Sequence, residues 1–303
     1  MLDPFTHPLT LWRLSDGKPG HDSQVQGLIE AMQRLQSLRD LPAIRVVDIP
    51  LPARSLGLLD WFFRRFPPGF MQPRPDLLVG AGHRTHWPLL CARRAYGGRA
   101  VALMTPSLPL SWFDCVVAPA HDERTGANVI VTLGALNPMR PAALKRPGYT
   151  VIMVGGASRH FHWDSDGVIH QIEQLVSRHP QLCITDSRRT PEPMRAVLRS
   201  KWPVVYQPWE TCLPGWLSQE LSVAENAWVS EDSVSMIYEA LTAGCATGLI
   251  TVPASNEGRL ARGIRMLERM GRVRRIDSQT RPTADAPLAE ADRVAGLLMG
   301  GLS

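Results

Sequence analysis

The 303-residue sequence has no long apolar run. No stretch of about 18 or more apolar residues occurs, which excludes a membrane-spanning helix. Residues 1–8 lack the basic-then-apolar order of a signal peptide. The five cysteines are scattered and form no CxxC pair. We therefore expect a cytoplasmic protein with reduced thiols, and neither a disulfide framework nor a zinc site.

Several catalytic and nucleotide-binding motifs are also absent. The chain has no GxxxxGK[ST] phosphate loop, no GxGxxG after its first apolar run, no GxSxG turn and no YxxxK pair. These absences argue against an NAD(P)-dependent epimerase. The histidines and aspartates at positions 160, 162, 164 and 166 match no familiar ligand spacing, so we expect no metal and no cofactor.

The chain carries a net charge of +5, and arginine supplies most of the dispersed excess. Scattered arginines are consistent with an ordinary solvated surface. They are equally consistent with attraction of phosphates, nucleotides or an anionic membrane face. No continuous basic stripe or aromatic-interleaved motif occurs, so nucleic acid is not an expected partner.

Short apolar runs alternate with amphipathic segments along the whole chain. Strands are predicted at residues 9–14, 44–49, 76–79, 100–104, 114–118 and 128–133, and again at 150–154, 181–185, 203–207, 227–229 and 248–252. Alternating strands and helices predict parallel sheets with crossover helices. The fold class is therefore α/β, with two Rossmann-like doubly wound parallel-sheet domains facing across a cleft.

A Pro-rich, basic stretch at residues 137–149 predicts the linker between these domains. The expected N-terminal domain is residues 1–140, and the expected C-terminal domain is residues 150–303. The last helix, near residues 288–298, either stays with the second domain or packs back on the first. Ligands of open parallel sheets bind at the carboxyl ends of the strands, where the loops between strands and helices lie.

Two such loops belong to the first domain. The loop at residues 15–24 precedes a helix whose start we expect Asp22 or Ser23 to cap, and a helix N-terminus favours an anion. The second loop, residues 80–85, offers close backbone approach and an arginine. Tight glycine turns would explain both loops without a ligand. The candidate residues are Asp16 and His21 as proton acceptors, with Gly17, Lys18, Gly82 and Arg84 binding substrate.

Three loops of the second domain suit a phosphate. Two glycines at residues 155–156 predict uncovered N–H groups, two arginines at 188–189 suit a diphosphate, and hydroxyls at residues 230–235 precede a helix. Strand-end turns, a solvated turn and simple helix capping are the alternatives. The candidate substrate-binding residues are Gly155, Gly156, Ser158, Arg159, Ser187, Arg188, Asp232, Ser233, Val234, Ser235, Met236 and Glu239.

The segment from Trp61 to Met71 is both aromatic and basic. If exposed, it would rest at a membrane interface with its arginines on phosphates. If buried, it is a helix that ends at the prolines, and the buried or partly buried interpretation is favoured. A peripheral location on the inner face of the membrane stays open.

Five stretches resemble the bacterial branch of the mitochondrial-fission "elongated mitochondria" (ELM-like) family. They read LWRLSDGKPGHDSQVQGLIEAM, GAGHRT, VGGASRHFHWD, TDSRRTP and SEDSVSMIYEAL, and they are spread over most of the chain in the family's order. That family is in turn similar to GT-B glycosyltransferases, which bind a nucleotide sugar in the C-terminal domain. The resemblance implies that residues 233–236 bind the pyrophosphate and Glu239 binds the ribose. It further implies that Gly155, Gly156, Ser158 and Arg188 border the donor, and that the loop at residues 17–21 faces the acceptor side.

Two functions follow from this resemblance. The first is a metal-independent glycosyltransferase that moves a sugar from a nucleotide-diphosphate donor to a cell-envelope acceptor, which could be lipid-linked. The second is a non-catalytic ELM-like scaffold or adaptor that binds a protein partner. The resemblance supplies no catalytic base, so Asp16 and His21 are assigned on chemistry alone.

Overall fold

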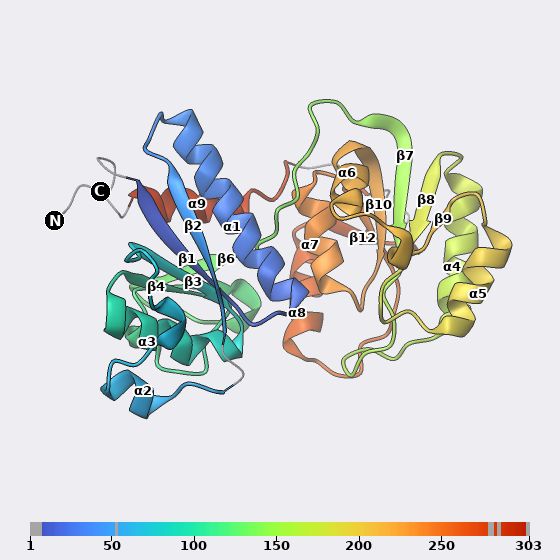
Figure 1. The fold of residues 1–303 in the computed structure, drawn as a ribbon. Helices are drawn as coiled ribbons and strands as arrows, with labels where there is room; N and C mark the ends of the chain where they lie inside the picture. The colour runs from blue at the N-terminus through green and yellow to red at the C-terminus, as the bar shows by residue number, and fades with distance from the viewer. Residues whose placement is uncertain (1–7, 52–53, 278–281, 284–285, 301–303) are drawn as a thin grey trace. The chain divides into compact units, whose positions relative to one another are not determined.

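The computed structural model describes residues 8–51, 54–277, 282–283 and 286–300. The chain divides into two compact units, each described by itself below: Met1–Pro138 with Ala289–Ser303, and Met139–Leu288 (Figure 1). Within the described ranges, no helix is long and apolar enough to cross a membrane. The expectation that residues 1–8 form no signal peptide concerns a segment of which only Pro8 lies within the described residues.

The first unit contains a six-stranded sheet in which every neighbouring pair is parallel. The strand order is β2-β1-β3-β4-β5-β6. The strands are β1 (Leu9–Ser15), β2 (Ile44–Pro50), β3 (Leu77–Ala81), β4 (Arg99–Leu103), β5 (Cys115–Pro119) and β6 (Val129–Thr132). The α-helices are α1 (Pro19–Leu38), α2 (Leu58–Phe62), α3 (His86–Tyr96) and α9 (Glu290–Gly300).

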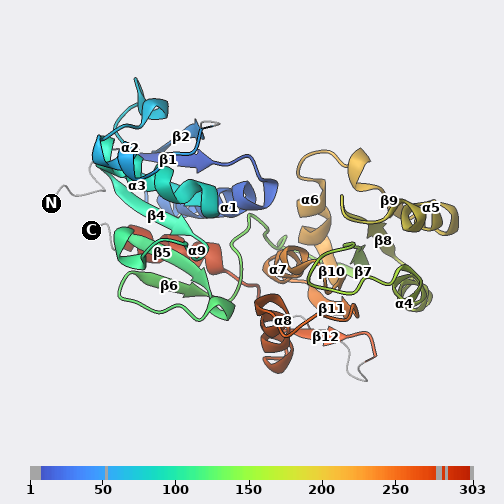
Figure 2. The ribbon, with the colours of Figure 1, turned by 90° about the horizontal axis from the view of Figure 1, so that it is seen from below.

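Alternating residues of the strands pack in two separate hydrophobic clusters. Figure 2 shows the ribbon of this sheet and its helices from below. Leu11 of β1 packs in a cluster with residues of α1 and α9, such as Leu28 and Leu298. The next residue, Trp12, packs in the other cluster with residues of α3, such as Leu89. Successive strand side chains point to opposite faces, so this pattern is what a sheet covered on both faces requires.

The second unit repeats the architecture, with the strand order β12-β11-β10-β7-β8-β9 and only parallel pairs. Its strands are β7 (Arg146–Met153), β8 (Leu182–Thr185), β9 (Tyr206–Gln207), β10 (Ala224–Ser230), β11 (Ala246–Ile250) and β12 (Val273–Arg275). Its α-helices are α4 (Ser165–Arg178), α5 (Glu192–Lys201), α6 (Trp216–Val223), α7 (Val234–Thr242) and α8 (Arg259–Arg269).

The predicted fold class is confirmed, because both units are doubly wound parallel sheets with flanking helices. Two local predictions were wrong. Residues 146–149, placed in the linker, begin strand β7. Helix α1 starts at Pro19, with Lys18 as the capping residue and no side-chain cap bond, so neither Asp22 nor Ser23 caps it. Proline presets the helical φ and needs no hydrogen-bonding N–H at the first position, which explains the earlier start.

Each sheet has one point where the chain reverses the direction in which it adds strands. In the first unit this switch lies between β1 and β3, and in the second between β7 and β10. The two connections that follow such a neighbouring pair leave in opposite directions and open a crevice at the carboxyl ends. The loops after these four strands are therefore the first places to look for a site.

Candidate functional site

The switch point of the first unit holds a histidine–aspartate pair. Nδ1 of His21 lies 3.1 Å and 3.0 Å from the two carboxylate oxygens of Asp16. The Asp16 side chain is fully buried, and the backbone N–H of Lys18 also donates to it over 3.2 Å. One-fifth of the His21 side chain stays exposed. A carboxylate on Nδ1 fixes the tautomer and leaves Nε2 as a proton acceptor.

Gly82, which follows β3, packs directly against this imidazole. A Cβ atom at Gly82 would lie 2.1 Å from Cε1 of His21, and its φ of +85° also favours glycine. The two predicted loops of the first unit thus meet at His21. The other candidates here, Lys18 and Arg84, are exposed, and Gly17 occupies open space at a φ of +76°.

A second histidine of the same region is not suited to proton transfer at neutral pH. His86 begins α3, is buried, and places Nδ1 3.3 Å from the Ser107 hydroxyl. Burial, with the nearby His83 and His21, lowers the pKa of His86 to about 4. Loss of water disfavours the charged imidazolium, so His86 stays neutral.

The switch point of the second unit is closed by hydrogen bonds between its own loops. The N–H of Gly155 donates to the Ser230 hydroxyl over 2.7 Å, and the N–H of Gly156 donates to Asp232 over 2.9 Å. The prediction that these N–H groups are uncovered was therefore wrong. The glycines serve close packing instead: a Cβ would lie 2.2 Å from Asp232 at Gly155 and 2.0 Å from the Arg189 carbonyl oxygen at Gly156.

Arg189 joins three parts of this loop cluster. Its guanidinium lies 2.8 Å from the Asp232 carboxylate and donates to the Gly156 carbonyl over 2.8 Å. Burial raises the pKa of Asp232, an effect that the Gly156 N–H and Arg189 oppose. The Ser187 and Thr190 hydroxyls both donate to the Gly155 carbonyl oxygen. Arg189 and Asp232 are thus structural partners of each other.

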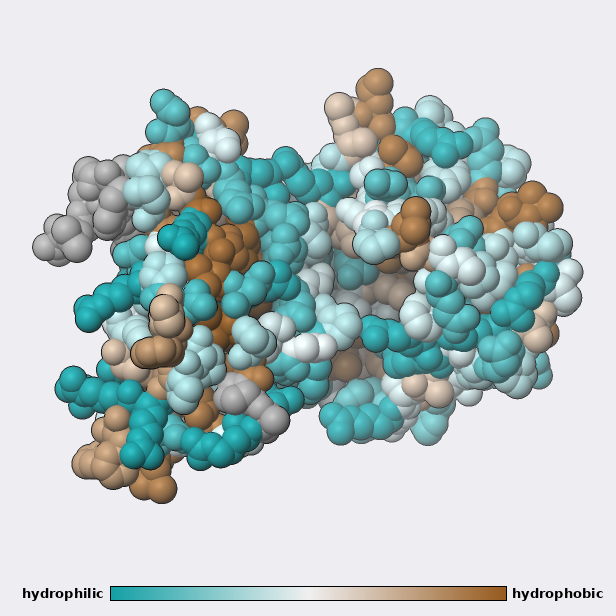
Figure 3. Space-filling view, in the orientation of Figure 1, coloured by the Kyte–Doolittle hydropathy of each residue, from teal (hydrophilic) through white to brown (hydrophobic). Residues whose placement is uncertain are grey.

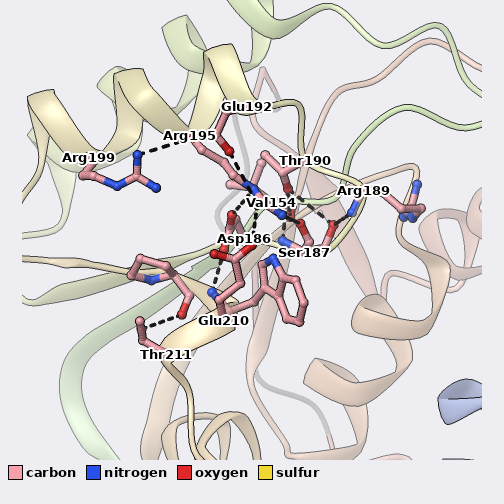
Figure 4. A network of polar contacts seen from close by, with 12 residues as sticks. Val154, Asp186, Ser187, Arg189, Thr190, Glu192, Arg195, Arg199, Glu210 and Thr211 are labelled. Atoms are coloured by element: carbon pink, nitrogen blue, oxygen red, sulfur yellow. Dashed lines mark hydrogen bonds and ion pairs between the residues drawn. The ribbon is translucent and has the colours of Figure 1, made fainter.

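A second charged network lies at the other end of the same turn (Figure 4). Arg195 of α5 pairs with Asp186 over 2.9 Å and with Glu210 over 2.8 Å, and it donates to the Ser187 carbonyl. Asp186 also accepts the Trp209 N–H over 2.8 Å. These bonds fix the turn after β8 and place the Trp209 ring beside it.

A pocket of about 450 Å³ opens between this turn and the start of α7, a size typical of small-molecule sites. The predicted residues that line it are Ser187, Arg188, Ser233, Ser235 and Met236. Arg189, one of the two arginines expected to suit a diphosphate, also lines it, and the lining residues that the sequence interpretation missed are Thr185, Asp186, Trp209, Cys212, Trp216 and Leu217. Trp209, which comes directly after Pro208 and β9, was the one local sequence feature that could have indicated this side of the pocket.

Helix α7 brings an electropositive end to the pocket. The N–H groups of the first turn have no intrahelical acceptor, and Ser233, at the capping position, makes no side-chain cap bond. Arg188 also lines the pocket, and its guanidinium lies 5.9 Å from the centre of the Trp209 ring. Backbone donors, hydroxyls and a guanidinium around one space are a recurring arrangement for phosphate.

Glu239 lies one turn along α7 from Met236 and Ser235, on the same side of the helix. It is partly exposed, yet loss of water raises the pKa of its carboxyl to about 7. Glu239 does not line the pocket itself, and neither do Val234, Gly155, Gly156 or Asp232.

Ser158 and Arg159 lie apart from the pocket lining. The Ser158 hydroxyl accepts the His160 N–H over 3.3 Å, and Nε of Arg159 lies 3.0 Å from Nε2 of His160. Across the described part of the chain, no group of three or more His, Cys, Asp or Glu side chains is placed to hold a metal ion.

The sequence matches one protein-family model over nearly its whole length. The model is described as mitochondrial fission ELM1, and it covers residues 19–302. No protein of curated function matches the sequence closely enough to count as a relative.

Solved structures resemble the fold at low sequence identity. The UDP-GlcNAc 2-epimerase of Methanocaldococcus jannaschii, in complex with UDP-GlcNAc and UDP, has 10% identity and a TM-score of 0.52, covering 97% of this chain and 100% of that one. A putative UDP-N-acetylglucosamine 2-epimerase of Listeria monocytogenes has 10% identity and a TM-score of 0.54, with coverages of 96% and 88%. MurG of Acinetobacter baumannii has 16% identity and a TM-score of 0.46, with coverages of 96% and 91%. The likeness to the two epimerases establishes a GT-B-like fold.

Proposed function

The chain belongs to the mitochondrial fission ELM1 family, and from this premise and its GT-B-like fold we propose that it is a glycosyltransferase. It transfers a sugar from a nucleotide-diphosphate donor to an acceptor of the cell envelope. The observation that carries the proposal is the 450 Å³ pocket at the start of α7, where Arg188, Ser233 and Ser235 meet two tryptophans.

In this proposal, different residues in and beside the pocket bind the diphosphate, the ribose and the base of the donor. The first-turn N–H groups from Val234 to Met236, with the hydroxyls of Ser233 and Ser235, hold the diphosphate. Arg188 pairs with its phosphate oxygens. Glu239 accepts hydrogen bonds from the ribose, and Trp209 or Trp216 stacks on the base, because tryptophan offers a flat apolar face to an aromatic ring.

The first unit supplies the acceptor chemistry in this proposal. Nε2 of His21 takes the proton of the acceptor hydroxyl while Asp16 holds the imidazole in place. The acceptor oxygen forms a bond to the sugar C1, and the bond from C1 to the diphosphate oxygen breaks. The leaving diphosphate keeps its electron pair and is stabilised by the α7 dipole and Arg188.

We place the acceptor near a membrane surface. The segment from Trp61 to Met71 exposes several large apolar side chains, among them Phe62, Phe63 and Phe70, next to arginines. The prediction of a buried helix that ends at the prolines was therefore wrong: Phe66 is buried, but α2 already ends at Phe62. Apolar side chains in the headgroup region and arginines on phosphates hold a protein at an interface without spanning it. A peripheral position on the inner face suits an acceptor that is attached to lipid.

Donor binding is tested by thermal unfolding with a panel of UDP-, GDP-, ADP-, CMP- and dTDP-linked ligands. One of them should raise the melting temperature, because a ligand that binds only the folded state stabilises it. The absence of any shift at millimolar concentration would contradict the proposal. Ser233→Trp, which puts a large side chain at a buried position of the pocket wall, should remove the shift.

The family also favours a second candidate, a scaffold that kept the fold and binds a protein partner without turnover. The two proposals differ in what the pocket is for. If Ser233→Trp and Glu239→Ala abolish the cellular phenotype while partner binding persists, the scaffold proposal fails. If both variants leave the phenotype intact, the glycosyltransferase proposal fails.

A further inference from the structure

A second pocket, of about 540 Å³, lies in the first unit between α2, α3 and the turn Leu110–Trp112. Its walls are mostly aromatic and aliphatic. Trp87 and Leu90 come from one side of α3, Trp61 and Leu58 come from α2, and Trp112 closes the rim. Trp87 and Trp112 are neighbours, with ring centroids 5.9 Å apart. A pocket with these walls suits an apolar chain.

Arginine is the only charged residue type in the lining of this pocket. Arg93 is committed to the protein, since it pairs with Asp114 over 3.1 Å and donates to the Trp112 carbonyl over 2.9 Å. Arg94 is exposed and lies over the Trp61 ring at 5.4 Å. No described carboxylate is paired with Arg94, so its guanidinium is available for an anion.

The acid nearest in sequence to this wall is already neutralised. Asp60 of α2 is buried and accepts a hydrogen bond from Arg54 over 2.6 Å. Arg65, which follows α2, lies over the Phe63 ring at 5.2 Å. The surface around the pocket mouth is therefore positive, which selects an anionic ligand over a neutral one.

Leu58 of α2 lines the pocket and also belongs to an exposed apolar surface on that helix. Leu59 is 72% exposed and Phe62 is 66% exposed, and Figure 3 shows hydrophobic residues over α2, at the lower left, with hydrophilic residues beside them. Such a patch with a polar rim marks a contact site. Because Leu58 belongs to both the patch and the pocket, an apolar chain would pass from a bilayer into the pocket over apolar side chains.

We infer that this pocket binds a lipid that carries a phosphate, with its apolar chain between Trp61, Trp87 and Trp112 and its phosphate on Arg94. The α2 surface brings the protein to the bilayer from which the chain enters. This inference goes beyond the proposed function, because lipid binding here requires no turnover at the nucleotide pocket. The lipid comes from one of two sources, a bilayer phospholipid or a prenyl phosphate.

The test is calorimetric titration of the full chain with farnesyl phosphate, dodecyl phosphate, farnesol and inorganic phosphate. We expect the two chain phosphates to bind at least tenfold more tightly than farnesol, and inorganic phosphate not to bind measurably. Preference for farnesyl over dodecyl phosphate assigns the pocket to a prenyl lipid, and equal binding assigns it to phospholipids in general. Failure of both chain phosphates to bind overturns the inference.

Two variants locate the binding. Arg94→Gln removes the free cation, and Ser111→Trp fills the pocket from an exposed position without touching the core. Each should weaken farnesyl phosphate at least tenfold, whereas Arg178→Gln in the other unit should leave it unchanged. Equal binding by all three variants would also overturn the inference. The thermal shift with nucleotide ligands should persist in all three, so failure here is distinct from failure of the proposed function.

Discussion

The two units place their functional residues at the same point of the same architecture, yet they use it differently. In the first unit, the switch point presents a partly exposed imidazole that is fixed by a buried carboxylate. In the second unit, the corresponding loops bond to one another through Gly155, Gly156 and Asp232, and the open space lies to one side, at Arg188 and α7. The topology fixes where a site forms, and the loop chemistry decides between proton transfer and binding.

The largest effect is expected from the first unit. His21→Ala removes the proton acceptor and should lower the rate of sugar transfer by about 10²- to 10⁴-fold. The affinity for the donor should stay within about twofold, because the donor pocket lies wholly in the second unit. Rates with the responding donor, and calorimetry with the same ligand, measure the two quantities.

Asp16→Asn provides the matched control for this prediction. It keeps the side-chain shape but removes the charge that orients Nδ1 of His21. We expect an intermediate loss of rate and no loss of donor affinity. A weaker donor affinity in either variant would break the contrast between the two units.

Disturbing the close packing at the switch point of the second unit should lower the free energy of unfolding. Gly156→Ala places a Cβ 2.0 Å from the Arg189 carbonyl oxygen, so the loop must shift. Overpacking of this kind costs about 3 kcal/mol in the free energy of unfolding. Urea unfolding measures it.

Gly20→Ala is the control in the first unit, because nothing lies within 4 Å of the added atom. It should change the free energy of unfolding by less than about 1 kcal/mol, and in the stabilising direction, since alanine favours the helix. Equal effects of the two substitutions would contradict the interlocked loop of the second unit.

The neighbouring arginines separate binding from stability within one turn. Arg188→Gln should weaken nucleoside diphosphate binding about 10- to 100-fold, since charge-assisted bonds to phosphate contribute about 1.5–3 kcal/mol. Arg189→Gln leaves Asp232 without its cation. It should lower the free energy of unfolding by about 1–3 kcal/mol, reduced from a fully buried pair because Arg189 is 39% exposed.

Calorimetry and urea unfolding of both variants test this pair of effects. Arg178→Gln, an exposed arginine of α4, is the control for a general loss of positive charge. If Arg189→Gln weakens binding while leaving stability unchanged, the structural role assigned to Arg189 is wrong.

Much of the fold was readable from the sequence because buried parallel strands are short β-branched runs. The run at residues 114–118, for example, agrees within one residue at each end with the fully buried strand β5. Helix α3 was not predicted, because His86, Trp87 and Pro88 begin it without a clear apolar period. Strand β12 was not predicted, because it is an edge strand that pairs on one side only and therefore need not be apolar. Two of its three residues are Arg274 and Arg275.

The candidate site was less predictable than the fold. Arg188 and Arg189 cannot be told apart by position, because only the fold brings Asp232 to one of them. Gly82 and His21 are separated by many residues, and their contact depends on β3 lying next to β1. Trp216 lines the pocket from the start of α6, and the backbone of Trp209 is held by Asp186, which is in turn paired with Arg195.

The smallest effect concerns the pH dependence of donor binding. Burial raises the pKa of the Glu239 carboxyl to about 7. If the ionised form accepts hydrogen bonds from the ribose, the affinity should be nearly constant above pH 8 and should fall as the pH drops through 7. A single group with this pKa gives roughly a tenfold loss of affinity between pH 8 and pH 6.

A nucleotide sugar is the right probe, because its diphosphate has no free terminal group whose second pKa near 6 would add to the profile. Glu239→Gln should bind more weakly at pH 8 and show a flat profile, whereas His21→Ala should keep the slope. A slope that persists in Glu239→Gln would assign the titration to another group and remove Glu239 from the donor site.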